Sequence, residues 1–331
     1  MFALINETTM RSYLTGIGWA IYCFAIVCSC SQVPRIGNDA TKSDVSNPKN
    51  DSSINFLLLG DWGRGGAFYQ KSVANQMRSE AIKRPIDFVF SMGDNFYPSG
   101  VSSIDDAGWW ESFENVYSFK SLNVPWYSVF GNHDYGGSIQ AQLDYGKINK
   151  RWATKERYYS FEKAIPSSAQ KVLFVFIDTN PFDHTLNRSS HSDLANQDTL
   201  AQLRWLQQLL ASNTAHWKIM IGHHPLFTTG ARKEQVPDVR NSFLPLIRKY
   251  QVNAYFSGHE HDLQYQKPEG MTHYFVSGAG SAVRPLQSNE IYTRFAASDP
   301  GFISVQLMQD TMQLQIINYK GLQLFKTSIT R

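Results

Sequence analysis

The sequence predicts a layered α/β domain, and three observations carry this prediction. From Ile54 onward, apolar runs of strand length alternate with amphipathic stretches of helical length, the pattern that layered α/β domains produce. Five of the apolar runs end in a glycine that polar side chains follow. After Gly280 the chain changes to strand-like segments with short polar breaks, which predicts a closing run of antiparallel strands.

Each apolar run is predicted to be one strand. In order they are INFLLL (54–59), DFVFSM (87–92), VPWYSVF (124–130), KVLFVFI (171–177), WKIMI (217–221) and VNAYFS (252–257), followed by FISVQLM (302–308) and TMQLQIINY (311–319). Two stretches between them, 70–83 and 198–212, are predicted helices. In the second helix, leucines recur at about helical spacing and are expected in the core: Leu200, Leu203, Leu206, Leu209 and Leu210.

The first 53 residues are predicted to precede the folded domain. Residues 1–30 are a predicted signal peptide, because Arg11 precedes an uncharged apolar run of about 15 residues, shorter than the ~20 that a spanning helix needs. Residues 31–53 are polar, as expected of a flexible tether, and 54–331 form the predicted domain. Export is therefore expected, to the periplasm, the medium or the cell surface.

The three cysteines, Cys23, Cys28 and Cys30, all lie in or beside the predicted signal segment. The domain itself has no cysteine, so a metal site there must use His, Asp, Asn or Tyr. Val27 to Cys30 resembles a loose bacterial lipobox, which would lipidate Cys30 and anchor the protein to a membrane; ordinary cleavage without a lipid is the alternative. The net charge of +3, without blocks of like charge, does not indicate nucleic-acid binding.

Five strand ends carry a glycine with candidate metal ligands. They are GDWG (60–63), GDNFY (93–97), GNHD (131–134), GHHP (222–225) and GHEHD (258–262). Taken singly, such an aspartate is a common turn or helix-cap residue, and such histidines can be structural. In α/β domains, however, sites gather at the carboxyl ends of strands, so together the motifs favour a two-metal site.

The residue types indicate which metals the site takes. Carboxylates, an amide and imidazoles without sulfur suit iron, manganese or zinc. Asp94 is the candidate that bridges two ions, because a carboxylate has two oxygens. Tyr97, three residues later, would provide a hard anionic phenolate, and this points to Fe³⁺ in one of the two positions.

The five motifs, in this order, resemble the metal-ligand blocks of the purple acid phosphatases, a group of calcineurin-like metallophosphoesterases. The resemblance is nearest to the small, tartrate-resistant type. It extends from about Asn55 to beyond Tyr319 and includes VPWYSVFGNHD, INKRW and LRWLQQLL. It implies a sandwich of two mixed β-sheets flanked by helices, with residues 54–331 as a metallophosphoesterase catalytic domain.

The resemblance also implies the ligands and the reaction. It implies an Fe³⁺ site formed by Asp61, Asp94, Tyr97 and His261. It implies a site for divalent Fe²⁺, Zn²⁺ or Mn²⁺ formed by Asp94, Asn132, His223 and His259. The implied activity is hydrolysis of small phosphate monoesters at acidic pH by a metal-bound hydroxide. His133 would bind substrate together with Asn132 and protonate the leaving group, with Asp134 orienting it.

The sequence departs from the family pattern beyond GHHP. The small-type enzymes commonly have a second active-site histidine there, whereas this chain has LFTTGARKE, with Arg232 near that position. Arginine can bind phosphate but cannot act as a general acid, so His133 acts alone or His224 assists it as a second substrate-binding histidine. Asp262 stands where an asparagine is common.

The polar insertion from Asp183 to Gln197 lies where related enzymes carry a regulatory loop; a solvated surface loop is the alternative.

Three other functions are alternatives to a phosphate monoesterase. A phosphodiesterase or nucleotide pyrophosphatase could use the same scaffold, because the metal ligands do not define what lies beyond the phosphate. A surface protein could bind phosphate or metal without turnover, and the absence of the second active-site histidine is compatible with this hypothesis. A zinc β-lactamase-like hydrolase is disfavoured, because HEHDLQ places its aspartate one position early for HxHxDH.

Overall fold

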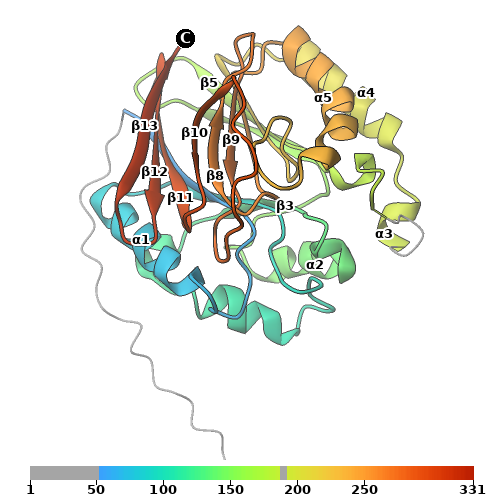
Figure 1. The fold of residues 1–331 in the computed structure, drawn as a ribbon, viewed down its shortest axis with the longest axis vertical. Coiled ribbons are helices and arrows are strands. Elements are labelled where there is room, and N and C mark those ends of the chain that lie inside the picture. Colours follow the sequence, from blue (N-terminus) through green and yellow to red (C-terminus); the bar gives the residue numbers. More distant parts are fainter. Residues whose placement is uncertain (1–51, 187–191) are drawn as a thin grey trace, which may run out of the picture. The chain divides into compact units, whose positions relative to one another are not determined.

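The computed structural model describes residues 52–186 and 192–331, and these form two mixed β-sheets flanked by helices (Figure 1). This arrangement confirms the predicted fold class. The predicted signal peptide, most of the predicted tether and the middle of the 183–197 insertion lie outside the described residues.

The first sheet has six strands in the order β13-β12-β11-β1-β2-β3. In chain order its strands are β1 (Ile54–Leu59), β2 (Phe88–Met92), β3 (Trp126–Val129), β11 (Gly301–Leu307), β12 (Thr311–Asn318) and β13 (Gln323–Thr330). Strands β1, β2 and β3 are parallel, and β11 pairs antiparallel with β1. The closing strands β11, β12 and β13 are antiparallel, as predicted.

The second sheet has seven strands in the order β10-β8-β9-β7-β6-β5-β4. In chain order they are β4 (Tyr159–Ala164), β5 (Lys171–Phe176), β6 (Trp217–Ile221), β7 (Ala254–Ser257), β8 (Leu263–Gln266), β9 (His273–Ser277) and β10 (Thr293–Ala297). Strands β5, β6, β7 and β9 run parallel. The carboxyl ends of β6 and β7 therefore lie at one edge of this sheet.

Helices cover the outer faces of both sheets (Figure 1). They are α1 (Gln70–Lys83), α2 (Ile139–Ile148), α3 (Ser192–Ala195), α4 (Thr199–Ser212) and α5 (Val236–Lys249), with a π-helical segment η1 (Trp109–Glu114) and 3-10 turns η2 (Lys120–Leu122), η3 (Asp134–Gly136), η4 (Asn180–Phe182) and η6 (Lys233–Gln235). The apolar side chains of α1 pack with residues of β1 and β2, and those of α4 and α5 pack with residues of β5, β6 and β7.

The main core lies between the two sheets. It joins side chains from β1 and β2, such as Phe56 and Phe90, to side chains from the other sheet, such as Phe174 and Phe256. In α4, Leu206 and Leu210 are buried and Leu203 and Leu209 are partly buried. The prediction that Leu200 is core is wrong: it is 61% exposed in the first turn of α4, where the helical stripe has turned away from the sheet.

None of the helices that the structure describes combines the length and apolar character needed to cross a bilayer.

Candidate metal centre

The predicted ligands lie just beyond β1, β2, β3, β6 and β7, and the backbone there is unusual. Asp61, Asp94 and His259 have φ values of 59°, 50° and 69°. Left-handed backbone is uncommon outside glycine, and it concentrates at functional sites because the surrounding structure must hold it in place. Three strand-end turns are therefore strained at the residue whose side chain points inward.

The glycines of these turns allow close approach. A Cβ on Gly131 would lie 2.1 Å from Asp94 Oδ1, and one on Gly258 would lie 2.5 Å from Asp61 Oδ2. Such distances are far below van der Waals contact, so any larger residue would displace the carboxylate. The Gly-plus-ligand pattern thus follows from the close packing of these turns, within one sheet at Gly131 and between the two sheets at Gly258.

Four of the predicted ligands form a first donor cluster. The Tyr97 hydroxyl lies 3.1 Å from Asp61 Oδ1, 2.8 Å from Asp94 Oδ2 and 3.1 Å from His261 Nε2. His261 Nε2 is 3.3 Å from Asp61 Oδ1. Oxygens outnumber nitrogen here, and two of the side chains are carboxylates, so the cluster suits a hard cation.

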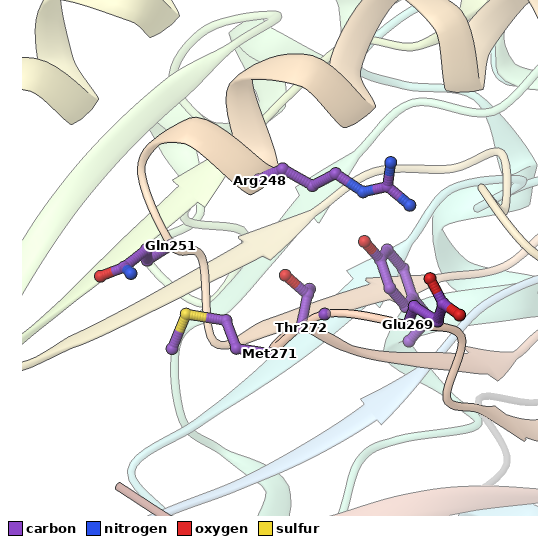
Figure 2. Close-up of a pocket in the computed structure, with 7 residues that line it drawn as sticks. Arg248, Gln251, Glu269, Met271 and Thr272 are labelled. Carbon is purple, nitrogen blue, oxygen red and sulfur yellow. The ribbon is translucent and has the colours of Figure 1, made fainter.

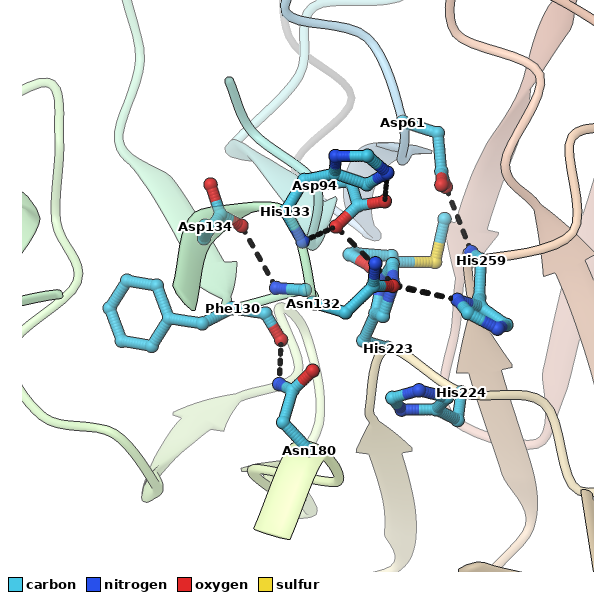
Figure 3. A network of polar contacts seen from close by, with 12 residues as sticks. Asp61, Asp94, Phe130, Asn132, His133, Asp134, Asn180, His223, His224 and His259 are labelled. Atoms are coloured by element: carbon cyan, nitrogen blue, oxygen red, sulfur yellow. Dashed lines mark hydrogen bonds and ion pairs between the residues drawn. The ribbon is translucent and has the colours of Figure 1, made fainter. Parts of the chain in front are cut away.

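A second donor cluster shares Asp94 with the first and includes Asn132, His223 and His259 (Figure 3). His259 Nδ1 is 3.0 Å from Asn132 Oδ1 and 3.1 Å from His223 Nε2. His223 Nε2 is 3.2 Å from Asn132 Oδ1 and 3.5 Å from Asp94 Oδ1. His223 Nδ1 donates to the carbonyl oxygen of Met92 at 2.8 Å, and because a carbonyl only accepts, His223 Nε2 carries a lone pair.

Asp94 belongs to both clusters through different oxygens. Its Oδ2 faces Tyr97 in the first cluster, and its Oδ1 faces His223 in the second. Oδ1 also accepts the backbone N–H of His133 at 2.8 Å. The side chain is buried. This is the geometry that one carboxylate needs in order to bridge two ions.

The electrostatics of the clusters fit bound cations. Burial, together with the Asp94 carboxylate, raises the pKa of Asp61 to about 7, and burial with both carboxylates raises the pKa of Tyr97 well above its usual value. Burial lowers the pKa of His259 well below its usual value and that of His261 to about 3. Without a cation the anionic forms of Asp61 and Tyr97 are disfavoured, while the imidazoles stay neutral, which is the form that binds metal.

His133 lies at the edge of the centre with a half-buried side chain. Its Nδ1 donates to the Pro98 carbonyl oxygen at 2.6 Å, and its Nε2 is 4.0 Å from Asp94 Oδ2. The expectation that Asp134 orients this ring is not met. Asp134 is buried and accepts backbone N–H groups from Gly131 and Asn95 at 2.8 and 3.1 Å, so it fixes the turn rather than the imidazole.

Three residues that the sequence did not single out also surround the centre. The Arg64 guanidinium carbon lies 3.5 Å from the Tyr97 ring centroid. Arg284 Nη1 donates to the His259 carbonyl oxygen at 3.4 Å, and Gln235 Oε1 is 2.6 Å from His259 Nε2. Arg64 follows GDWG directly and could have been found from that motif. Gln235 and Arg284 carry no local signal.

The two predicted substrate-binding side chains beyond His133 differ in position. His224 is fully buried, with Nδ1 2.8 Å from Thr179 Oγ1 and Nε2 3.4 Å from Asp183 Oδ2. Its ring centroid is 4.3 Å from that of His259, so it lies behind a predicted ligand and presents no surface to a substrate. Arg232 is half-buried, and its backbone N–H donates to Glu260 Oε1 at 2.7 Å.

Two cavities differ in their relation to the centre. The cavity in Figure 2, of about 430 Å³, lies between the end of α5 and the turn before β9. Its lining residues, which include Arg248, Glu269 and Thr272, contain no member of either donor cluster. A cavity of about 500 Å³ is lined by Arg64, Tyr97 and other residues and adjoins the first cluster. Of the two cavities, only the second therefore shares a residue, Tyr97, with the predicted ligands.

We expect the stability of the metal-free protein to change with pH below about 7 and to level off just above it. Burial raises the pKa values of Asp61 and Asp134 from 3.8 to about 7, so the stability that these carboxyl groups contribute is fully present below about pH 4 and is lost as pH rises to 7. The pKa values of His223, His259 and His261 are lowered from 6.5, so stability is lost as pH falls below 6.5. Thermal unfolding of chelator-treated protein between pH 4 and 9 measures both limbs. A melting temperature that keeps rising above pH 7 would contradict the expectation.

Comparison with known proteins agrees with the site. Residues 54–263 match the family model described as calcineurin-like phosphoesterase. Purple acid phosphatase 7 of Arabidopsis thaliana is 31% identical over 334 residues, which cover 93% of this chain and 97% of the relative. Tartrate-resistant acid phosphatase type 5 of Rattus norvegicus is 33% identical over 301 residues, which cover 85% of this chain and 91% of the relative.

The chain therefore belongs to the calcineurin-like phosphoesterase family. Within that family its relatives are the purple acid phosphatases and the tartrate-resistant acid phosphatases. The predicted family and enzyme class are both confirmed.

Solved structures share the fold. The structure of Plasmodium GAP50, described as the anchor in the inner membrane complex, superposes with a TM-score of 0.73 at 22% identity and covers 84% of this chain and 89% of its own. Purple acid phosphatase PPD1 from yellow lupin seeds gives a TM-score of 0.66 at 18% identity, covering 86% and 55%. At these identities the likeness concerns the fold alone.

Proposed function

We propose that the protein hydrolyses small phosphate monoesters at acidic pH with a binuclear metal centre. Fe³⁺ would be held by Asp61, Asp94, Tyr97 and His261. A divalent Fe²⁺, Zn²⁺ or Mn²⁺ ion would be held by Asp94, Asn132, His223 and His259. The observation that carries the proposal is that the two oxygens of Asp94 each belong to one of two adjacent donor clusters.

When bound, two such ions would orient the phosphoryl oxygens, neutralise charge that develops in the transition state and acidify water. The chain itself supplies the surroundings. Arg64, Arg232 and Arg284 each contribute a positive charge that acts on His261, so the mouth of the centre attracts an anion. Together with Tyr97, Arg64 lines the adjoining cavity, which would receive the organic part of the ester.

His133 is the group positioned to move a proton. Because Nδ1–H is held by the Pro98 carbonyl oxygen, Nε2 is the atom that faces the centre near Asp94. In the imidazolium form this Nε2–H can be given to a leaving alkoxide. The buried His224 cannot make this transfer directly, and we assign it a positioning role behind His259.

Replacing Tyr97 by phenylalanine tests the proposal. The wild type is expected to carry about two metal ions per chain, including iron, and to show a broad visible band from a tyrosinate bound to Fe³⁺. The band should vanish in Tyr97→Phe, because the phenolate oxygen is gone. Metal content and an absorption spectrum measure this. A colourless wild type that holds only zinc or manganese would remove Tyr97 as an iron ligand and favour a phosphodiesterase or nucleotide pyrophosphatase, which rates on diester substrates would then show.

A surface protein that binds phosphate or metal without turnover is the second candidate, because Arg232 stands near the position where the small-type enzymes commonly have a second active-site histidine. It predicts wild-type protein with a full metal content and no hydrolysis of any phosphate monoester. Wild-type activity that His133→Ala removes, with both ions retained, would reject this candidate.

We also propose export of the protein, with Cys30 as a site of lipid attachment. The basis is the sequence alone, because these residues lie outside those that the structure describes. The intact mass of the mature protein measures the outcome. Cleavage that leaves Cys30 unmodified, or that removes it, would contradict the anchor.

A further inference from the structure

We propose that Gln235 is a positioning residue for the divalent ion. Its side-chain oxygen fixes the proton of His259 on Nε2 and at the same time holds Arg232 beside the centre. The inference rests on the proposed function for the identity of the second cluster as a divalent site, but its test measures metal binding and does not require turnover.

The first contact involves the ring of His259. Gln235 Oε1 lies 2.6 Å from His259 Nε2. The same oxygen lies 3.4 Å from Arg232 Nη1, and because a guanidinium only donates, the atom facing it must be the amide oxygen rather than the amide nitrogen. An amide oxygen only accepts, so His259 Nε2 carries the proton and Nδ1 carries a lone pair directed at Asn132 and His223.

This contact completes the second donor cluster. Its other imidazole, His223, has its proton fixed by the backbone carbonyl oxygen of Met92. Gln235 does the same for His259 with a side chain. Because both tautomers are fixed, His223 Nε2 and His259 Nδ1 each present a lone pair. These lone pairs face the oxygens of Asn132 and Asp94, and neither ring nitrogen carries a proton. Outer partners of this kind orient a ligand histidine and raise its basicity.

The turn that carries Gln235 is held from two sides. Gln235 closes η6, where its N–H donates to the Arg232 carbonyl oxygen at 3.0 Å, and it directly precedes α5. Arg232 N–H donates in turn to the buried carboxylate of Glu260, which lies between His259 and His261 in sequence. Lys233 forms an ion pair with Glu290. The amide is therefore presented to His259 by a fixed turn.

The same oxygen also holds the Arg232 guanidinium near the centre. Arg232 occupies the region where the small-type enzymes commonly have a histidine, and a long guanidinium needs a partner in order to stay near the site. Gln235 provides that partner, so one side chain connects the ligand His259 to the cation that would meet the phosphate. Loss of Gln235 should then weaken metal binding and phosphate binding together, whereas loss of Arg232 should weaken only phosphate binding.

Four variants separate these roles: Gln235→Leu removes the acceptor, Gln235→Glu keeps it, Arg232→Ala removes the cation, and Glu234→Gln is a matched control on the exposed face of the same turn. The affinity for Zn²⁺ is measured by competition with a chelator, the visible band reports the iron, and inhibition by inorganic phosphate reports anion binding. We expect Gln235→Leu to bind Zn²⁺ about 10–100-fold more weakly while keeping the visible band. We expect Gln235→Glu and Glu234→Gln to bind Zn²⁺ like the wild type.

Several results would overturn the proposal. Wild-type Zn²⁺ affinity in Gln235→Leu would show that the contact does not position His259. Equal Zn²⁺ loss in Gln235→Glu, which keeps both the shape and the acceptor oxygen, would show that the acceptor does not determine Zn²⁺ binding, and equal loss in Arg232→Ala would assign the effect to the arginine. If Gln235→Leu fails to fold, Gln235→Asn replaces it, because its side chain is one methylene too short to reach His259. Weaker Zn²⁺ binding in Gln235→Asn than in Gln235→Glu would then support the proposal, and equal Zn²⁺ binding would contradict it. A wild type that binds both ions but hydrolyses nothing would contradict the proposed function and leave this inference standing.

Discussion

Asp94→Asn is expected to lose both metal ions and to lower kcat by about a thousandfold or more. The reason is that Asp94 contributes one oxygen to each donor cluster, and the amide nitrogen of asparagine cannot replace an anionic oxygen in the second position. Metal-ion stabilisation of the transition state is worth several kcal/mol, and each 1.36 kcal/mol is about tenfold in rate. Metal analysis and steady-state kinetics measure the two effects.

Asparagine is the appropriate replacement because it tolerates left-handed backbone better than alanine does, and Asp94 has a φ of 50°. Asp106→Asn is the matched control: this aspartate follows in the same loop region, bonds Ser102 and Gly108 and stays outside both clusters. It should keep both ions. Asp94→Asn protein that still holds two ions per chain would show that the carboxylate does not bridge them.

His133→Ala is expected to keep both ions and to lose about 10²–10⁴-fold in kcat on alkyl phosphates, the range that a general acid contributes. His133 is not part of either donor cluster, and its Nε2 is 4.0 Å from Asp94 Oδ2. The loss should be much smaller with p-nitrophenyl phosphate, because its leaving group needs little protonation. The ratio of the two losses is therefore the informative quantity.

Kinetics on both esters, with metal content as the control, decide the role of His133. An equal loss on both substrates with unchanged metal content would indicate that His133 binds phosphate and does not donate a proton. A loss of metal would show that the imidazole, whose Nε2 lies 4.0 Å from Asp94 Oδ2, supports the centre itself. His224→Asn is a useful companion, since the buried ring should affect metal binding more than the choice of leaving group.

Much of the fold followed from local patterns. The runs 54–59 and 217–221 form strands with those same bounds, and the predicted helix 70–83 is α1. Helix α5 was not predicted, because Pro237 and Pro245 interrupt its pattern although its buried residues keep helical spacing. The edge strands β4 and β10 are only half-buried, so they lack the apolar runs that marked the central strands.

The sequence by itself determined which residue types form the centre and in what order, because each ligand motif follows a buried strand and begins with a glycine. Only the tertiary structure decided how they combine. It takes Asp61, Asp94 and Asn132 from one sheet and His223, His259 and His261 from the other, and it buries His224 while bringing Gln235 to His259. The physical reason is that strand and turn signals extend over a few neighbouring residues, whereas the packing of two sheets brings together residues that are far apart in the sequence.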